Sequence, residues 1–575
     1  MQDEHFPVKD FPPWKAVREE IDFDDLSSDK RLNNLLKSVL SEVKLYAEDQ
    51  IKHIKQLTQI GLALSSEKDI NKLLENIVDQ ARDLSNADAG TLYILEDDKK
   101  FLRFEIIQND SMSIRMGGTN IIEQTLPKVP LYDPQGRPNH ANVSSHTAIT
   151  GNIINIPDVY EAEGFDFTGP RKYDKSTGYR SKSMLVIPLK NHENDIIGVL
   201  QLLNAQDPDT GEVVAFSPEY VDLIGSLASQ AAVALTNTQL IQDLKNLFYA
   251  FIRSIATAID AKSPYTRGHI DRVVDLTMMI ADVVNESTAG AFKDTFFNED
   301  EIEEMRIAAW MHDVGKITTP EYIVNKSTKV ETIFDRIHLI ETRFDLIAEQ
   351  IRTRFLNQKI LILANESLDS PAIDRIDQKC SEKLARLSDD LEFIKACNSP
   401  GEFLEDDSIE RIRQIGSRTY FLNGREQPCL TADEIENLSI RKGSLTDAER
   451  DRIQDHATMT LKMLTQLPFP KKLSNVAEYA SGHHEKLDGS GYPRGLSGNE
   501  LALQSKIMAV ADIFEALTAK DRPYKKPMKL SQAVKILGFM EKERHIDPEV
   551  LDIFLSKKLH LKYARIQMDP EQIDM

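Results

Sequence analysis

Histidine and aspartate stand side by side in His312-Asp313-Val314-Gly315-Lys316, near the end of an apolar helical pattern. An imidazole nitrogen and a carboxylate both bind metal ions, and the two oxygens of one aspartate can bridge two cations about 3.5–4 Å apart. Apolar residues before this segment recur every three or four positions, which places His312 on the buried face of the predicted helix. A single histidine of this kind is more often a satisfied core residue, so its partners decide the interpretation.

Further candidate ligands lie on or beside the inner faces of other predicted helices: His269, His456, His483, His484 and Asp512. The helix predicted over 507–519 is apolar almost all round except for Asp512 and Glu515, and a buried carboxylate must be paired or bound to a cation. One site with two metal ions satisfies all these residues at once. Because its ligands are rich in nitrogen and include a bridging carboxylate, iron, manganese or zinc suits it better than magnesium or calcium.

The composition limits the classes of protein that can hold such a site. The chain has 575 residues, which exceeds one hydrophobic core and predicts two or three domains. Its 70 basic and 92 acidic residues give a net charge of −22, so we expect it to bind neither nucleic-acid polymers nor membranes. The three cysteines are sparse and form no CxxC motif, which is typical of a reducing compartment. Without a long apolar run, we expect a cytoplasmic protein.

The first half of the chain predicts an N-terminal arm and amphipathic helix over 1–51, followed by an α/β region. Polar turns separate the α/β elements, which are a helix over 70–84 and strands over 89–95, 101–107, 183–189 and 196–203.

This α/β region resembles GAF domains of cyclic-nucleotide phosphodiesterases and cyclases. The resemblance is carried by Tyr173–Tyr179, Met184–Leu189 and Ile197–Asn204, and it covers about 52–240. It implies a sensor module that binds a small ligand or serves as a dimerising spacer.

The nucleotide-binding subset of that family carries an Asn-Lys pair, then a Phe and a distal Asp/Glu pair. This chain has Asn204-Ala205, Phe216 and Glu219 instead. Because the lysine is missing, we expect a ligand-free or differently liganded dimerisation module, and the ligand stays unknown.

A connecting helix is predicted over 217–262. Ser217 is suited to the N-cap and Pro218 to the first helical position, and no further proline occurs before Pro264. We interpret so long a helix as one that packs against its copy in a homodimer and carries the ligand state of the GAF domain onward. The alternative is a rigid spacer.

The second half resembles the HD-GYP family, a branch of the HD phosphohydrolases, over about 245–560. The matching motifs are the start Tyr265–His269, the His312–Lys316 segment, the helical His456, the run His483–Pro493, and Ala511–Thr518 with Asp521–Lys525. Since that family is all-helical, we expect a multidomain protein with an α/β GAF domain followed by an all-α HD-type helical bundle over 245–575. Residues 331–441 depart from the family and form a helical insertion, which can cap the active site, bind the GAF domain or extend the dimer.

The resemblance implies two metal sites that share Asp313 as a bridging ligand. The first would contain His269, His312, Asp313 and Asp512, and the second Asp313, His456, His483 and His484. Members with three metals carry a glutamate where this chain has Tyr265, so we expect two divalent ions, iron or manganese.

The same resemblance implies hydrolysis of cyclic di-GMP to pGpG and GMP. A hydroxide that bridges the two metals would attack phosphorus, with Asp313 and Lys316 as catalytic residues. Lys316 would bind a phosphate oxygen or assist departure of the 3′ oxygen. The other expected substrate contacts are Asp488, Gly491, Tyr492, Pro493, Arg494, Arg522 and Lys525.

Each of these contacts has a plainer interpretation. The arginines and lysines can be surface cations, and the residues of the 488–493 loop can serve only to form a turn. In the family this loop also meets partner proteins, which makes a protein partner possible for this chain. Two further functions stay open: hydrolysis of another substrate, such as cyclic GMP-AMP or a simpler phosphate ester, and a catalytically silent receptor.

Overall fold

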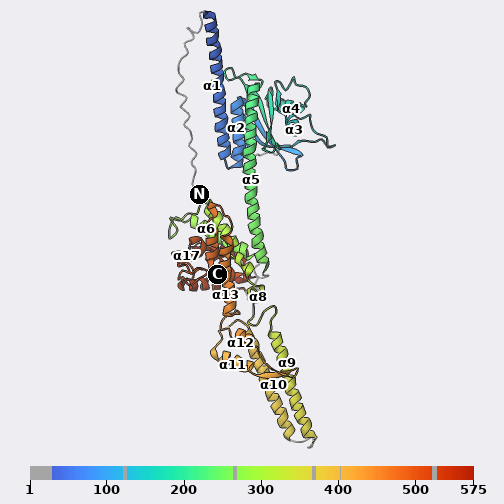
Figure 1. The fold of residues 1–575 in the computed structure, drawn as a ribbon, viewed down its shortest axis with the longest axis vertical. Helices are drawn as coiled ribbons and strands as arrows, with labels where there is room; N and C mark the ends of the chain where they lie inside the picture. Colours follow the sequence, from blue (N-terminus) through green and yellow to red (C-terminus); the bar gives the residue numbers. More distant parts are fainter. Residues whose placement is uncertain (1–28, 121–125, 263–267, 365–370, 402, 521–526) are drawn as a thin grey trace. The chain divides into compact units, whose positions relative to one another are not determined.

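The computed structural model describes residues 29–120, 126–262, 268–364, 371–401, 403–520 and 527–575. The chain divides into two compact units, residues 1–246 and 247–575, which we describe separately (Figure 1). Within the described ranges, no helix combines the length and the apolar character needed to cross a membrane.

The first unit is built on an antiparallel sheet with the strand order β3-β2-β1-β7-β6-β5, in which β4 also pairs with β2 and β8 with β7. The strands are β1 (Ala87–Leu95), β2 (Phe101–Asn109), β3 (Ile114–Gly117), β4 (Val129–Pro130), β5 (Ile154–Ile156), β6 (Met184–Lys190), β7 (Ile196–Gln206) and β8 (Val213–Val214). The four strands expected from the sequence are β1, β2, β6 and β7, and all four are confirmed. The short edge strands lack the repeated apolar pattern that would predict them.

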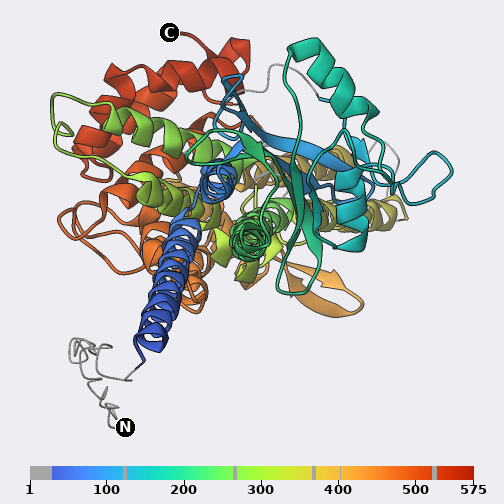
Figure 2. The same ribbon diagram turned by 90° about the horizontal axis from the view of Figure 1, so that it is seen from above.

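Helices cover both faces of this sheet, which is why β6 is buried along nearly its whole length. The helices of this unit are α1 (Lys30–Ser66), α2 (Ile70–Ser85), α3 (Val143–Thr150), α4 (Thr168–Thr177) and the first part of α5 (Pro218–Lys262). One core joins α1, α2 and α5 to the sheet, and a second core joins α3 to its opposite face. Figure 2 looks nearly along α5 and shows the sheet between that helix and α3.

The second unit is a helical bundle around one large core. Its helices outside the insertion are the last part of α5, and α6 (His269–Asn285), α7 (Glu299–Met311), α8 (Glu321–Val324), α13 (Asp447–Leu464), α14 (Val476–Ser481), α15 (Leu503–Thr518), α16 (Leu530–Lys542), α17 (Pro548–Ser556) and α18 (Leu559–Gln567). Two short 3-10 helices matter for the site, η2 (Val314–Thr318) and η4 (Gly482–His484). The predicted α/β domain followed by a helical bundle is therefore confirmed.

The insertion has a hydrophobic core of its own. Its elements are α9 (Ile337–Leu363), α10 (Pro371–Asn398), α11 (Asp406–Gly416), α12 (Ala432–Leu438) and a hairpin of β9 (Thr419–Leu422) and β10 (Arg425–Pro428). α9 and α10 form a long helical pair (Figure 1).

The expectation of a purely helical insertion is wrong at this hairpin. Asn423 and Gly424 form its two-residue loop with φ angles of 52° and 76°, a combination that asparagine and glycine adopt readily. The first helix of the insertion also begins later than residue 331, because α9 starts at Ile337 and the preceding Ile333 is 93% exposed.

Candidate metal centre

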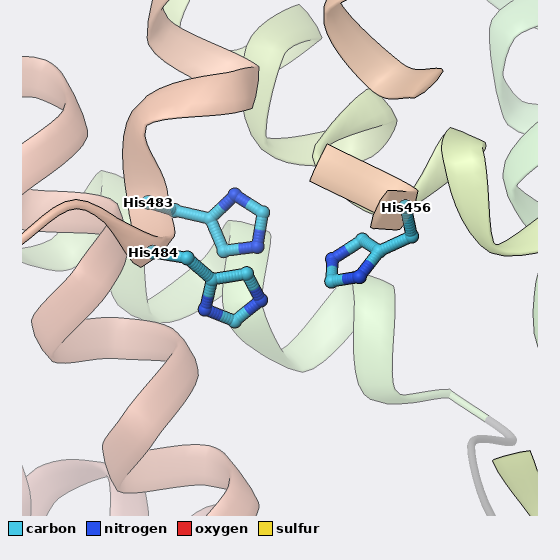
Figure 3. Close-up of side chains that lie close together, drawn as sticks. All are labelled: His456, His483 and His484. Atoms are coloured by element: carbon cyan, nitrogen blue, oxygen red, sulfur yellow. The ribbon is translucent and has the colours of Figure 1, made fainter. Parts of the chain in front are cut away.

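Five helical segments of the second unit bring the predicted metal ligands together. His269 opens α6, His312 and Asp313 follow α7, His456 lies in α13, His483 and His484 lie in η4, and Asp512 lies in α15. These residues include two groups of three, and within each group the potential ligand atoms all lie within 4.8 Å of one another. We call His269, His312 and Asp313 the first group, and His456, His483 and His484 the second group. Figure 3 shows the second group, with the ring of His456 facing the other two from a different helix.

Asp313 lies between the two groups. Its Oδ2 atom is 3.3 Å from Nε2 of His312 and 3.7 Å from Nε2 of His269, while its Oδ1 atom is 3.4 Å from Nε2 of His456. Asp512 adds a second carboxylate to the first group, with Oδ1 3.3 Å from Nε2 of His269 and 4.0 Å from Nε2 of His312. One carboxylate oxygen of Asp313 thus faces each group, which is the arrangement a bridging ligand requires.

Three of the histidines are oriented by the backbone. In each, Nδ1 is within hydrogen-bond distance of the carbonyl three residues earlier: His312 to Ala309 at 2.7 Å, His456 to Ile453 at 2.5 Å and His483 to Ala480 at 2.6 Å. A nitrogen that donates to a carbonyl leaves the other nitrogen of a neutral imidazole with its lone pair. The Nε2 atoms of these rings and Oδ1 of Asp313 are buried and have no hydrogen-bond partner among the residues that the structure describes. Lone pairs that are buried and convergent in this way fit bound cations.

His269 is oriented by a carboxylate instead. Its Nδ1 atom contacts Oε2 of Glu515, whose Oε1 accepts a hydrogen bond from Nε of Arg272 at 2.6 Å. Glu515 is 1% exposed. The sequence identifies it as a buried carboxylate three residues after Asp512, on the same helical face, but it does not reveal that His269, 246 positions away, is its partner.

The electrostatics favour neutral imidazoles in the second group. Burial, reinforced by the neighbouring His312, lowers the pKa of His483 to about 3. Burial also lowers the pKa of His456 and of His484. For His269, burial alone would lower the pKa, but the surrounding carboxylates raise it well above its ordinary value. A positive charge is therefore disfavoured at the second group and favoured beside the carboxylates of the first.

Lys316 points at the centre. Its ammonium forms an ion pair with Oδ2 of Asp313, and the lysine side chain is 27% exposed. Burial alone would raise the pKa of Asp313, but Lys316 and the adjacent histidines hold it well below its ordinary value. The predicted catalytic lysine thus lies at the edge of the centre and pairs with Asp313.

Close packing of η2 against α13 holds Asp313 beside His456. The backbone N–H of Gly315 donates to Oγ1 of Thr460 at 3.0 Å, and that hydroxyl donates to the carbonyl of His312 at 3.0 Å. A Cβ atom at Gly315 would lie 1.9 Å from the carbonyl oxygen of His456. Sequence reasoning did not identify Thr460, which in the sequence appears only as one residue of an apolar helical face.

The loop that follows η4 places an aromatic ring beside the second group. The Tyr492 ring centroid is 4.8 Å from that of His484 and 6.4 Å from that of His456. The buried carboxylate of Glu485 accepts hydrogen bonds from the backbone N–H groups of Arg494 at 2.7 Å and Leu496 at 2.9 Å. Glu485 therefore holds the loop in place, a role that the sequence did not indicate.

Among the other predicted substrate contacts, those in the 488–494 loop are described by the structure, whereas the two later ones are not. Asp488 is exposed and accepts from the N–H and hydroxyl of Ser490 at 2.9 and 2.8 Å, as in an ordinary turn. A Cβ atom at Gly491 would lie 2.4 Å from the backbone nitrogen of Lys486, so this glycine permits a close approach within the loop itself. Pro493 follows Tyr492, and the side chain of Arg494 is exposed. Arg522 and Lys525, like Tyr265, lie outside the described residues.

The positions compared with nucleotide-binding GAF domains are part of the fold of the first unit. The Asn204 amide accepts from the N–H of Lys182 at 2.7 Å and donates to the Tyr179 hydroxyl and to the Arg180 carbonyl, both at 2.9 Å. Phe216 is buried in the core. Glu219 is exposed in the first turn of α5.

Comparison with protein families separates the two halves of the chain in the same way. A GAF domain model matches residues 69–235, and two HD domain models match residues 266–394 and 431–550. This chain contains a GAF domain and an HD domain. Both resemblances noted in the sequence are therefore confirmed.

Relatives of the HD domain carry names that refer to cyclic dinucleotides. The chain is 44% identical over 131 residues to the 3'3'-cGAMP-specific phosphodiesterase 3 of Vibrio cholerae, a match that covers 22% of this chain and 26% of that protein. It is 41% identical over 130 residues to a probable cyclic di-GMP phosphodiesterase of the same species, covering 21% and 28%. It is 32% identical over 245 residues to the cyclic di-GMP phosphodiesterase response regulator RpfG of Xanthomonas campestris, covering 39% and 58%. These matches thus span between 26% and 58% of the relatives' own length.

Proposed function

We propose that this chain is a metal-dependent phosphodiesterase that hydrolyses cyclic di-GMP to pGpG and GMP, and that its GAF domain regulates this activity. The observation that carries the proposal is the Asp313 carboxylate, which directs one oxygen toward each histidine group. The relatives that match the HD domain support a cyclic dinucleotide as the substrate class.

The first ion would be held by the first group together with Asp512, and the second ion by the second group together with Asp313 as the bridge. Iron or manganese suits this set of imidazoles and carboxylates. When bound, two such cations supply a nucleophilic hydroxide at neutral pH and neutralise the oxygens of the phosphodiester.

The side chains around the centre would bind and orient the dinucleotide. The ammonium of Lys316 would turn from Asp313 to a phosphate oxygen and protonate the departing 3′ oxygen as the P–O bond breaks. Tyr492 would stack on a guanine. Arg494 and the predicted Arg522 and Lys525 would bind the second phosphate.

A second candidate substrate is 3'3'-cyclic GMP-AMP. Two Vibrio cholerae relatives named as specific for this dinucleotide are 44% and 39% identical to the matched region of this chain. A simpler phosphate ester is a third candidate, and a silent receptor would bind the dinucleotide without turnover. The buried, convergent lone pairs favour catalysis over the silent receptor.

Purified full-length protein, handled anaerobically and loaded with iron(II) or manganese(II), separates these functions. We would offer it cyclic di-GMP, 3'3'-cyclic GMP-AMP and bis(p-nitrophenyl) phosphate, with Asp313→Ala as the matched inactive variant. We expect turnover of cyclic di-GMP that the variant lacks. Selective turnover of another compound would identify that compound as the substrate. Binding without turnover would refute the proposed enzymatic activity.

We also propose that the protein is a homodimer in which α5 packs against its copy. The apolar residues Leu240, Leu244, Leu247 and Phe251 of α5 are 54% to 68% exposed. Their spacing of four, three and four positions is that of a coiled-coil seam. Sedimentation of the wild type and of Leu244→Glu tests this, since a charge in the seam should shift the dimer toward monomer. An unknown small ligand at the GAF domain and a protein partner at the 488–493 loop complete the proposal.

A further inference from the structure

The last turn of α5 contacts both segments that carry the first histidine group. Oδ2 of Asp260 accepts a hydrogen bond at 2.9 Å from the backbone N–H of Gly268, the residue before His269. Two positions later on the same helix, the ammonium of Lys262 donates to the backbone carbonyls at the end of η2: Lys316 at 3.0 Å, Ile317 at 2.6 Å and Thr319 at 2.6 Å.

The Lys262 contact has a clear physical role. The final carbonyls of a short helix lack partners within the helix, and a lysine ammonium has three donors and a charge that suits this end. Lys262 therefore serves as a cap for η2, supplied from a distant part of the chain. Asp313 immediately precedes η2 and Lys316 lies within it, so Lys262 contacts the segment that adjoins both residues.

The α5 segment that carries these two residues is firmly seated in the second unit. Ile252, Ala256 and Ile259 are between 1% and 5% exposed in its main core. The guanidinium of Arg253 lies 5.3 Å from the ring centroid of Trp310, which is two residues before His312. The C-terminal part of α5 thus contacts the start of α6, which contains His269, and also α7 and η2, between which His312 and Asp313 lie.

We propose that Asp260 and Lys262 are positioning residues through which α5 sets the geometry of the metal centre. α5 begins at Pro218 in the other unit, so one uninterrupted helix joins the GAF domain to these two contacts. A displacement of α5 along or about its axis pulls on η2 through Lys262 and on the start of α6 through Asp260. The inference rests on the proposed function, because the rate that it controls is that of phosphodiester hydrolysis.

The first test removes the cap of η2. Lys262→Met deletes the ammonium and keeps the length of the side chain, Lys262→Arg keeps the charge, and Lys245→Met is a control at an exposed lysine of the same helix. In full-length manganese-loaded protein we expect kcat of Lys262→Met to fall about tenfold with little change in KM, and Lys262→Arg to restore most of it. We expect the manganese EPR spectrum to change in Lys262→Met and not in Lys245→Met.

The second test is a double-mutant cycle that separates transmission from local stability. One alanine inserted after Gln242 turns the preceding part of α5 by about 100° relative to the HD domain. We expect the added alanine to change kcat at least fivefold in the wild-type background and by less than twofold in Lys262→Met. Equal effects of the added alanine on kcat in both backgrounds would overturn the proposal. A Lys262→Met protein with the kcat and the EPR spectrum of the wild type would also overturn it.

These measurements distinguish failure of this inference from failure of the proposed function. Turnover of bis(p-nitrophenyl) phosphate reports the geometry of the centre whichever dinucleotide is the natural substrate. Hydrogen exchange of the 312–320 peptide in metal-free protein reports the cap without any activity. Faster exchange in Lys262→Met than in Lys245→Met supports the cap, and equal exchange contradicts it.

Discussion

Replacing Gly315 by alanine tests how closely η2 must approach α13. The added Cβ would lie 1.9 Å from the carbonyl oxygen of His456 and 2.7 Å from the backbone nitrogen of Thr460. Both are backbone atoms of α13, so no side chain can turn aside to make room. One of the two segments has to move.

An alanine at position 315 would force η2 and α13 apart. The distance of 1.9 Å is about 1.5 Å short of an ordinary van der Waals contact at 3.4 Å. Asp313 stands two residues before Gly315, and its Oδ1 atom is 3.4 Å from Nε2 of His456. A shift of this size separates the shared carboxylate from the second group. We expect a loss of about 100-fold in kcat, since misplacement by about 1 Å can cost that much, and about 1–3 kcal/mol of stability from overpacking.

The assay compares Gly315→Ala with Gly538→Ala. Gly538 lies in α16, and nothing stands within 4 Å of the Cβ it would acquire. The control should keep full activity and gain up to about 1 kcal/mol of stability, because alanine is the better helix former. Metal content, kcat and thermal unfolding would be measured on both variants. If Gly315→Ala keeps two metal ions and a kcat within twofold of the control, the packing argument is wrong.

Three further predictions address individual side chains. Glu515→Gln removes the charge that orients His269, so we expect metal affinity to fall 10- to 100-fold in chelator competition, and unchanged affinity would contradict this role. Lys316→Met should keep its metal ions and lose about 100-fold in kcat; loss of metal instead would make the lysine structural. Burial, with His312 nearby, lowers the pKa of His483 to about 3 in the fold. Because the unfolded imidazole binds its proton near 6.5, protonation favours unfolding below that pH, and the metal-free wild type should lose about 2 kcal/mol between pH 7 and pH 5 relative to His483→Gln. If the free energy of unfolding in urea depends on pH in the same way for both proteins, the lowered pKa of His483 is refuted.

The metal-ligand positions could be predicted because burying histidine and aspartate side chains without partners costs free energy. One shared metal site would supply partners for all of them. His312 and His456 both lie at positions where apolar residues would otherwise be expected. The pairing of the ligands through Asp313 was accessible only through the family resemblance, since spacing along the chain does not report contacts between helices. The ligand assignment stays a prediction, to which the geometry adds convergent lone pairs.

The residues that orient the ligands could not be predicted. Glu515 and His269 are 246 positions apart, and Gly315 and Thr460 are 145 apart, so no local pattern links them. Contacts of this kind depend on how whole helices pack, which a single sequence does not specify. The Asn423-Gly424 hairpin is different, because asparagine followed by glycine is itself a sequence signal for a two-residue hairpin loop.

The insertion fits between α8 and α13 because its two ends are tied together. The buried ammonium of Lys326, just after α8, contacts Oδ1 of Asn437 at 2.7 Å and both carboxylate oxygens of Glu449 at 2.9 and 2.7 Å. Glu449 belongs to the capping box that begins α13, the helix of His456. The start of α13 is thus tied to the segment that leads into the insertion, which has a core of its own.

The proposed catalyst depends on two cations that would share the Asp313 carboxylate between the two histidine groups. Metal analysis of anaerobically purified wild-type and Asp313→Ala protein, together with EPR of the manganese-loaded forms, would reveal this shared ligand. We expect two ions per wild-type chain with a coupled spectrum, and loss of both the coupling and the hydrolysis in the variant. A wild-type protein that binds no transition metal, or a variant that keeps two coupled ions and full turnover, would contradict it.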